Sequence, residues 1–363
     1  MFITSFLRIG GEELSTLTLA SELQRQGHTV SLLSTPGGLL EEYERRGIEV
    51  TFGRVAGRRP LGVVLGAGDV RRAALDRHPD LIHTQSVVPT IMAFLATRAL
   101  PKARPKVIWH DRGIHEWSYP VVAKCFNFLT DFVIANSDYE RDRLVRNRLS
   151  QDRVRRVHNS INLEFPNHIR RDKQVLSDFG ISDDHFVVGI VSRLARTKGH
   201  VYLLRATPII AEKIGPVRIL IVGGGPLEAE LKALADELQI SDLVTFAGFR
   251  RELPALYSAM DLVVIPSLRE PFGNVAIEAA AFGLPVVASA VEGLPEAVDG
   301  GRTGMLVPPK HPARLAEAIL YLAENPSVAR QMGQAGRERV RRYFLPTRVA
   351  EEVEDVYRHV TAV

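Results

Sequence analysis

The sequence predicts an α/β protein made of two doubly wound domains, each built on a parallel sheet. Short apolar runs rich in β-branched residues alternate with longer segments of helical periodicity, and this alternation stops and restarts once along the chain. A length of 363 residues suits about two domains of ordinary size. Because ligands of doubly wound sheets bind beyond the carboxyl ends of the strands, we expect the functional site in a cleft between the two domains.

The first domain is expected over residues 1–165. Its strands are short apolar runs, and between them lie helical stretches such as the one that spaces Leu14, Leu17, Ala20 and Leu23 along one face. The runs that predict strands are Phe2–Phe6, Thr29–Ser34, Leu81–His83, Lys106–Trp109 and Phe132–Ala135.

The second domain is expected over residues 166–345, after a junction near 163–171 where periodicity is lost and Pro166 stops any helix. Residues 346–363 are expected to form a last helix. Its apolar stripe is Val349, Val353, Val356, Tyr357 and Val360, and an earlier helix carries Leu315, Ala318, Ile319 and Leu322. The runs that predict strands are Phe186–Val191, Val217–Val222, Val244–Ala247, Leu262–Ile265 and Pro285–Ser289.

Composition excludes several classes of protein. The apolar fraction of 45% and charged fraction of 24% are those of a globular protein. A single cysteine, Cys125, can form neither an intramolecular disulfide nor a structural zinc site. No apolar run reaches the roughly 18 residues of a membrane span. We therefore expect a cytoplasmic protein, with peripheral attachment to the inner face of the cytoplasmic membrane as an open question.

Positive charge is concentrated in the first domain. Residues 1–165 carry 23 Lys and Arg against 18 Asp and Glu, a net charge of +5. The cluster is either a solvated helix face or a surface for an anionic partner such as a membrane. Nucleic acid is not expected, because no aromatic residues interleave the cluster densely. The cluster consists of Arg141, Arg143, Arg146, Arg148, Arg153, Arg155 and Arg156, opposed only by Asp142 and Asp152.

Two motifs that follow strands suit an anion. Gly10-Gly11 precedes a helix, where the backbone can approach a phosphate, although a plain tight turn explains it equally well. No Gly-x-Gly-x-x-Gly fingerprint occurs, which disfavours a dinucleotide. Arg193 and Lys198 lie on the loop after a strand of the second domain. They are either two surface cations or a clamp for a diphosphate.

The strongest local signal is residues 265–279, Ile-Pro-Ser-Leu-Arg-Glu-Pro-Phe-Gly-Asn-Val-Ala-Ile-Glu-Ala. Glu270 precedes the turn and Glu278 lies on the helix after it, so the two carboxylates can hold hydroxyls of a sugar and a ribose. Free N–H groups at the helix start favour a phosphate. The alternative is that Glu278 pairs within its helix and Glu270 is solvated. The expected donor-binding residues of the turn are Phe272, Gly273, Asn274 and Val275.

The whole chain resembles a retaining glycosyltransferase of family 4, which implies a GT-B fold with two Rossmann-like domains. The resemblance rests on Gly10-Gly11-Glu12, 27–30 (Gly-His-Thr-Val), 79–84 (Pro-Asp-Leu-Ile-His-Thr), 131–137 (Asp-Phe-Val-Ile-Ala-Asn-Ser), 192–199, the Glu-x7-Glu element and 283–289. One departure is Asn159-Ser160-Ile161-Asn162, where the family has Asn-Gly-[Val/Ile]-Asp. Ser160 fits there without strain only if its φ is negative.

The resemblance implies a role for each matching residue. Arg193 and Lys198 hold the donor diphosphate, Glu270 contacts the transferred sugar, Glu278 binds the ribose, and Gly11 belongs to the donor site. It also implies that His110, which ends a strand, lies near the reacting sugar, with Asp111 and His115 as nearby alternatives, and that the last helix packs on the first domain. From its surroundings in the sequence alone, His110 would be a structural residue.

The expected function is transfer of a sugar from a UDP- or GDP-linked donor to a glycan or lipid-linked acceptor, in lipopolysaccharide, exopolysaccharide or glycolipid synthesis. No Asp-x-Asp motif ends a strand, so we expect no metal and no cofactor, with the diphosphate charge met by Arg193, Lys198 and helix N-termini. The alternatives are a nucleotide-sugar epimerase, a glycan phosphorylase, or a non-catalytic sugar-binding protein on the same scaffold.

Overall fold

The computed structural model describes residues 1–7, 10–57, 59–98, 100, 104–161, 165–166 and 172–362. The chain forms two compact units. Unit 1 comprises Met1–Asn162 together with Leu345–Val363, and unit 2 comprises Leu163–Phe344. The expected junction at 163–171 lies outside the described residues, except for Phe165 and Pro166.

Unit 1 contains a seven-stranded parallel sheet in the order β3-β2-β1-β4-β5-β6-β7. The direction of winding reverses between β1 and β4, which is where doubly wound folds bind ligands. Two strands, β3 and β7, were not expected, because they lie at the sheet edges and carry little continuous apolar sequence. The strands are β1 (Phe2–Ile3), β2 (Ser31–Ser34), β3 (Glu49–Phe52), β4 (Leu81–Thr84), β5 (Lys106–Asp111), β6 (Phe132–Ala135) and β7 (Val154–Arg156).

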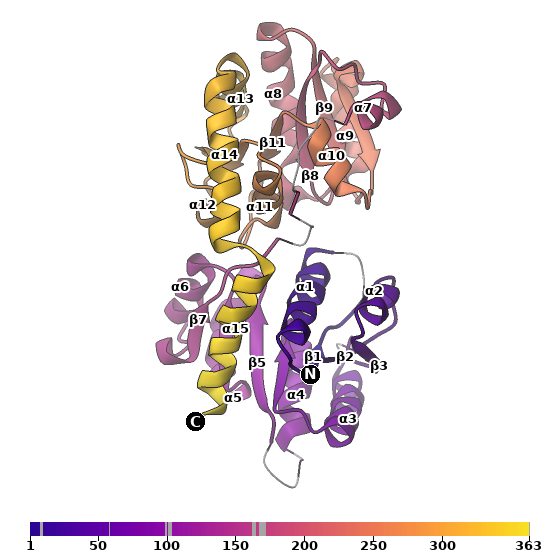
Figure 1. Ribbon diagram of the computed structural model, residues 1–363, viewed down its shortest axis with the longest axis vertical. Coiled ribbons are helices and arrows are strands. Elements are labelled where there is room, and N and C mark those ends of the chain that lie inside the picture. Colours follow the sequence, from indigo (N-terminus) through magenta and orange to yellow (C-terminus); the bar gives the residue numbers. More distant parts are fainter. Residues whose placement is uncertain are drawn as a thin grey trace. The chain divides into compact units, whose positions relative to one another are not determined.

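Helices cover both faces of this sheet (Figure 1). On one face, α1 and α15 lie side by side, and the apolar stripe of α15 packs against Phe2, Ile108 and Phe132 of the strands. On the other face, α3 and α4 pack against Ile3, Leu33 and Ile82. The helices are α1 (Gly11–Arg25), α2 (Leu40–Arg45), α3 (Pro60–Arg77), α4 (Val87–Arg98), α5 (Tyr119–Leu129), α6 (Asp138–Arg146) and α15 (Pro346–Thr361).

Unit 2 contains a six-stranded parallel sheet in the order β10-β9-β8-β11-β12-β13. All five strands expected from the sequence form within one residue of their expected ends, and the edge strand β13 adds a sixth. The strands are β8 (Phe186–Val191), β9 (Val217–Val222), β10 (Val244–Gly248), β11 (Leu262–Ile265), β12 (Val286–Ser289) and β13 (Gly304–Val307). Two parallel sheets of this order confirm the predicted α/β fold of the GT-B type.

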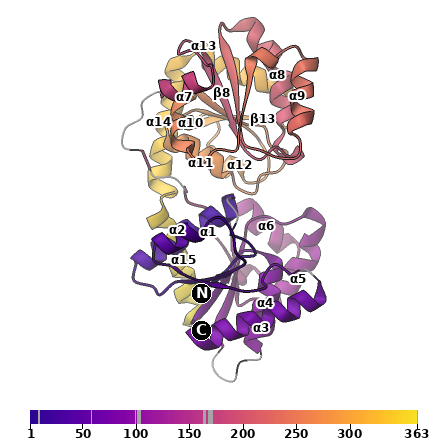
Figure 2. The same ribbon diagram turned by 90° about the vertical axis from the view of Figure 1, so that its right-hand side faces the viewer.

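The main core of unit 2 lies between its sheet and the helices α8, α9 and α13, and further helices lie across the sheet (Figure 2). The expected stripe of Leu315, Ala318, Ile319 and Leu322 is buried there. No helix among the described residues is both long and apolar enough to cross a bilayer. The helices are α7 (Lys173–Asp178), α8 (His200–Lys213), α9 (Glu228–Glu237), α10 (Leu253–Ala259), α11 (Asn274–Ala281), α12 (Leu294–Ala297), α13 (Pro312–Glu324) and α14 (Pro326–Tyr343).

Candidate functional site

Two loops of unit 2 join at the carboxyl ends of the neighbouring strands β8 and β11. The Leu268 N–H donates to the Thr197 carbonyl at 2.7 Å. Gly199 has φ +69°, and a Cβ there would lie 2.0 Å from the Pro266 carbonyl oxygen. Both observations require glycine at this position, because an L side chain would be strained and would displace the strand end. The close approach fixes the short 3₁₀ turn Arg196–Lys198 beside the loop that carries Glu270.

Lys198 and Glu270 form an ion pair in this corner. The Lys198 Nζ lies 2.6 Å from Glu270 Oε2, and both side chains are largely buried, with 25% and 16% exposed. Ser267 Oγ donates to the same oxygen at 3.3 Å. Arg193, which the sequence paired with Lys198, is exposed after β8, and its side chain has no partner among the described residues. The structure therefore brings Lys198 to Glu270 and leaves the Arg193 guanidinium open to a ligand.

A residue that no motif signalled holds the Glu270 loop in place. Glu292 Oε2 accepts the Glu270 N–H at 2.7 Å, and its Oε1 accepts from Arg269 Nε at 3.0 Å. Glu292 itself has φ +44°, which is uncommon for a side chain of this kind. The Gly293 N–H completes the link by donating to the Glu270 carbonyl at 3.1 Å. Glu292 and Gly293 therefore hold the backbone of the Glu270 loop, and this fixes the point from which the Glu270 side chain extends.

The predicted turn leads into α11, where Gly273 is the N-cap with φ +112°. Val275 lies in the first turn, where amide N–H groups lack partners within the helix. Phe272 is only 1% exposed and its ring packs edge-on against Phe344, with centroids 5.6 Å apart. Of the expected donor-binding residues, Phe272 therefore offers no side-chain surface to a ligand.

Glu278 is buried in the second turn of α11 and is held by Tyr257 of α10. The Tyr257 hydroxyl donates to Glu278 Oε2 at 2.9 Å, and both residues are at least 93% buried. Burial, followed by the negative charge of Glu278, raises the pKa of Tyr257 well above its usual value. The phenol therefore stays protonated and acts as a donor. No motif in the sequence signals Tyr257, because only the fold brings it to Glu278.

We expect Tyr257→Phe to weaken nucleotide binding, because Glu278 loses the donor that orients its carboxylate. A hydrogen bond to a charged group is worth about 1.5–3 kcal/mol, so affinity for a nucleoside diphosphate should fall roughly tenfold or more. Isothermal titration calorimetry measures this directly. Tyr321→Phe, which changes an exposed tyrosine of the same unit, should leave the affinity unchanged. Equal affinity in the two variants would mean that Tyr257 serves packing alone.

In unit 1, a polar network surrounds the carboxyl ends of β4 and β5. Glu12 Oε1, next to the predicted Gly11 at the start of α1, accepts from Ser86 Oγ at 3.0 Å. Arg112 donates through Nε to Gln85 Oε1 at 2.9 Å and also to Asn159. Burial raises the pKa of Glu12 and lowers the pKa of Arg112 to about 10. The sequence did not single out Arg112.

His110 is the penultimate residue of β5, 1% exposed, with its Nδ1 3.2 Å from Nε2 of His83. Burial lowers the pKa of both imidazoles well below the usual value, so both rings are neutral at pH 7. Of the two alternatives to His110, Asp111 is fully buried and accepts from the Gly113 N–H at 2.9 Å, while His115 is exposed beside Trp117. Ser160 is not among the residues of positive φ, so it fits its loop without strain.

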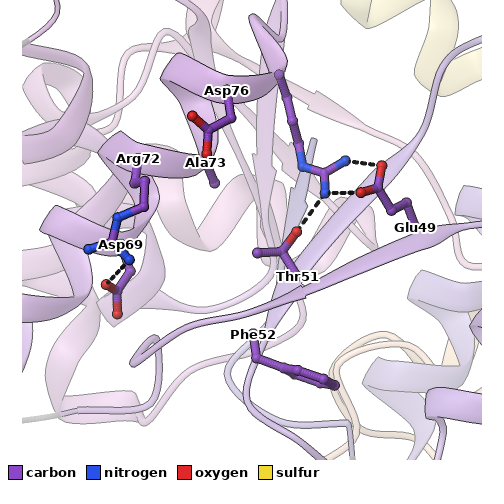
Figure 3. A pocket seen from close by; sticks show the side chains of 8 residues that line it. Glu49, Thr51, Phe52, Asp69, Arg72, Ala73 and Asp76 are labelled. Carbon is purple, nitrogen blue, oxygen red and sulfur yellow. Dashed lines mark hydrogen bonds and ion pairs between the residues drawn. The ribbon is translucent and has the colours of Figure 1, made fainter.

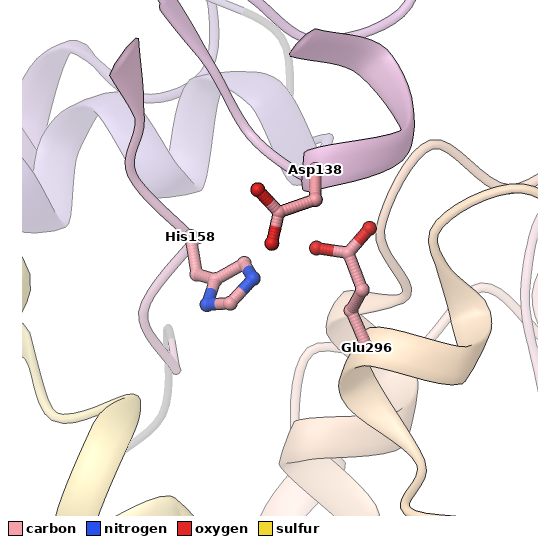
Figure 4. A group of neighbouring side chains, drawn as sticks. All are labelled: Asp138, His158 and Glu296. Atoms are coloured by element: carbon pink, nitrogen blue, oxygen red, sulfur yellow. The ribbon is translucent and has the colours of Figure 1, made fainter. Parts of the chain in front are cut away.

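Two further groups of charged side chains do not by themselves indicate a binding site. In unit 1, Asp138 and His158 place ligand atoms within 4.8 Å of each other (Figure 4; Glu296, also drawn, belongs to unit 2). Two ligands are too few for a metal centre. A cavity of about 450 Å³ beside β3 and α3 contains Glu49 and Thr51, which both accept from Arg77 (Figure 3). Its charges largely neutralise one another.

The chain matches two family models and several known proteins. The model described as "Glycosyltransferase Family 4" matches residues 9–165, and "Glycosyl transferases group 1" matches residues 173–339. A D-inositol 3-phosphate glycosyltransferase of Saccharomonospora viridis is 32% identical over 312 residues, which cover 82% of this chain and 68% of the relative. An alpha-maltose-1-phosphate synthase of Mycolicibacterium smegmatis is 36% identical over 254 residues, and that match spans 64% of each chain.

Solved structures share the fold along nearly the whole chain. A glycosyltransferase from Rickettsia africae has a TM-score of 0.86 at 20% identity, covering 99% of this chain and 98% of its own. Anabaena Alr3699/HepE, crystallised in complex with UDP and glucose, has a TM-score of 0.86 at 23% identity, covering 98% of each chain. At these identities the likeness establishes the fold.

Proposed function

Because the chain belongs to glycosyltransferase family 4, we propose that it transfers a sugar from a nucleotide-sugar donor to an acceptor hydroxyl, with retention at the anomeric carbon. The observation that carries this proposal is the Lys198–Glu270 pair, at 2.6 Å, beside the start of α11. The pair places a cation that can bind phosphate, Lys198, next to a carboxylate that can bind sugar hydroxyls, Glu270. The UDP and UDP-glucose bound by Anabaena Alr3699/HepE support a nucleotide-sugar donor, UDP- or GDP-linked.

Each residue has a proposed role. Arg193 and Lys198 bind the diphosphate, assisted by N–H groups of Gly273, Asn274 and Val275 at the start of α11. Glu270 holds the transferred sugar and Glu278 the ribose. His110 contributes a hydrogen bond near the reacting sugar, with Gly11 at the start of α1. The leaving phosphate oxygen takes the proton of the acceptor hydroxyl, which attacks from the same face.

Release of nucleoside diphosphate tests this proposal. Purified protein, incubated with a panel of UDP- and GDP-sugars and candidate glycan acceptors, should release the diphosphate from one donor. An epimerase would alter the sugar without such release, and a sugar-binding protein would be stabilised by the donor against heat without turning it over. The presence of Arg193, Lys198, Glu270 and Glu278 together favours the transferase over both alternatives.

We expect the reaction to need no divalent metal, because the proposed diphosphate site supplies its own positive charge. Activity should be unchanged when EDTA is added in excess over trace metals. The measurement is diphosphate release with and without EDTA. Loss of activity on chelation, restored by Mn²⁺ or Mg²⁺, would contradict this part of the proposal.

The acceptor is proposed to be a lipid-linked or envelope glycan, reached from the cytoplasmic side of a membrane. In the basic cluster, Arg143 is buried against Glu116 and Tyr119, and Arg153 donates to backbone carbonyls. Within the basic cluster, only Arg146, Arg148 and Arg155 are exposed. Beside it, α5 and the turn before it expose three large apolar side chains: Trp117 (80%), Val121 (64%) and Phe128 (74%). An apolar stripe near cations suits the surface of an anionic bilayer.

We expect unit 1 to bind anionic vesicles. Each nearby arginine contributes about 1 kcal/mol, and the attraction is screened by salt. Sedimentation with anionic liposomes should pull down the protein at low salt and lose it near 0.5 M salt. Arg146→Glu/Arg148→Glu should abolish sedimentation, whereas Arg205→Glu/Arg330→Glu, the same charge change on exposed residues of unit 2, should not. If the wild-type protein does not sediment with anionic liposomes, a soluble acceptor is favoured.

A further inference from the structure

Three side chains of unit 1 form a continuous chain of hydrogen bonds that ends at His110. The Tyr357 hydroxyl of α15 lies 2.5 Å from Nδ1 of His83, and Nε2 of His83 lies 3.2 Å from Nδ1 of His110. Both histidines are 1% exposed. The remaining ring nitrogen, Nε2 of His110, is buried and has no partner among the residues that the structure describes.

This chain of hydrogen bonds runs along one face of the sheet. His83 of β4 is in register with Ile108 of β5, so His110 lies two residues closer to the carboxyl edge on the same face. The ring of Phe2 stacks on His83 at 4.7 Å between centroids. Helix α15 covers this face, and its Tyr357 meets His83 edge-on, with the ring planes at 82°. The last helix is thus linked through His83 to His110 near the end of β5.

We propose that Tyr357 and His83 are positioning residues that fix the proton of His110 on Nε2, so that His110 donates a hydrogen bond to a substrate oxygen. This inference rests on the proposed function, and it gives His110 a definite role within it. An imidazole that carries its proton on Nε2 cannot accept a second proton there. His110 is then a donor and not the base that removes the proton of the acceptor hydroxyl.

The direction of the hydrogen bonds follows from the chemistry of the three groups. Burial lowers the pKa of both histidines and raises the pKa of Tyr357, so all three are neutral. A phenol is a stronger acid than a neutral imidazole and therefore donates its O–H to Nδ1 of His83. A neutral ring that accepts at Nδ1 carries its proton on Nε2. His83 therefore donates to Nδ1 of His110, which leaves the proton of His110 on Nε2.

Nitrogen NMR of the resting protein tests the assignment without any activity measurement. In protein labelled with ¹⁵N-histidine, long-range ¹H–¹⁵N spectra distinguish a protonated ring nitrogen from a bare one. His110→Gln and His83→Gln identify the two residues among the eleven histidines. We expect both rings to be neutral with the proton on Nε2. A proton on Nδ1 of His110, or a charged ring, would overturn the proposal.

A second NMR experiment removes Tyr357, the first donor of the hydrogen-bond chain. Tyr357→Phe should shift the Nδ1 resonance of His83 strongly, because that nitrogen loses its partner, and should move the resonances of His110 less. Tyr43→Phe is the matched control: it removes a buried hydroxyl of the same unit that has no partner among the described residues. It should move neither histidine. Unchanged His83 resonances in Tyr357→Phe would disprove the link to α15.

Steady-state kinetics then test whether this chain of hydrogen bonds affects the reaction. Tyr357→Phe should lower kcat about fivefold, the equivalent of one neutral hydrogen bond, with the donor KM within about twofold. Tyr43→Phe should match the wild type. If the protein turns over no nucleotide sugar, the proposed function fails while the NMR result stands. If it is active and Tyr357→Phe lowers kcat no more than Tyr43→Phe, the positioning role fails and the proposed function stands.

Discussion

Lys198→Ala is expected to lower kcat/KM for the donor at least about tenfold while the protein remains folded. The proposed role of Lys198 is a charge-assisted contact with the donor diphosphate, and losing such a contact costs about 1.5–3 kcal/mol of transition-state stabilisation. The substitution also removes the cation that lies 2.6 Å from Glu270, so a carboxylate that is 16% exposed loses its ion-pair partner and keeps the Ser267 hydroxyl as a donor. Both effects act on the transfer step, and steady-state diphosphate release measures them together.

Arg196→Ala is the matched control, because Arg196 is an exposed cation of the same 3₁₀ turn and has no proposed contact with the donor. It removes the same charge within two residues of Lys198 and should retain wild-type kinetics. Thermal unfolding of both variants should confirm that the fold is intact. Wild-type kinetics in Lys198→Ala would refute the diphosphate clamp, and equal losses in the two variants would indicate a general effect of net charge.

Glu270→Gln is expected to lower kcat by about 10- to 100-fold and to change the affinity for free nucleoside diphosphate by no more than about twofold. The amide keeps the shape of the side chain but loses the charge that holds sugar hydroxyls and that pairs with Lys198, an effect of roughly 1.5–3 kcal/mol. A nucleoside diphosphate has no sugar at the position that Glu270 is proposed to contact. Its affinity for the protein should therefore be nearly the same in Glu270→Gln as in the wild type.

Glu278→Gln supplies the comparison, since its proposed partner is the ribose. This substitution should lower the affinity for nucleoside diphosphate roughly tenfold, because a neutral amide is a weaker acceptor for ribose hydroxyls. Calorimetry gives the affinities and initial rates give kcat. The reverse pattern, with Glu270→Gln impairing diphosphate binding and Glu278→Gln impairing transfer alone, would exchange the two roles.

Edge strands show where sequence patterns reach their limit in this fold. The central strands of both sheets are buried on two faces and read as continuous apolar runs, so the sequence located them. The edge strand β3 has no fully buried residue, and β7 and β13 are short and only partly buried. In such strands the backbone pairing, and not an apolar pattern, decides the structure. The first strand was expected to reach Phe6 but ends at Ile3.

The sequence by itself determined the two parallel-sheet units, the family, and the positions of Lys198, Glu270, Glu278 and His110 at strand ends or on the helix that follows. These depend on short-range patterns, in which apolar spacing, glycine and a carboxylate pair lie within a few residues. Only the tertiary structure identified the residues that orient them. Glu292 reaches Glu270 across 22 residues, Tyr257 reaches Glu278 across 21, and Tyr357 reaches His83 across 274. A buried carboxylate or imidazole needs a hydrogen-bond partner, and the fold supplies that partner from whatever segment it brings alongside.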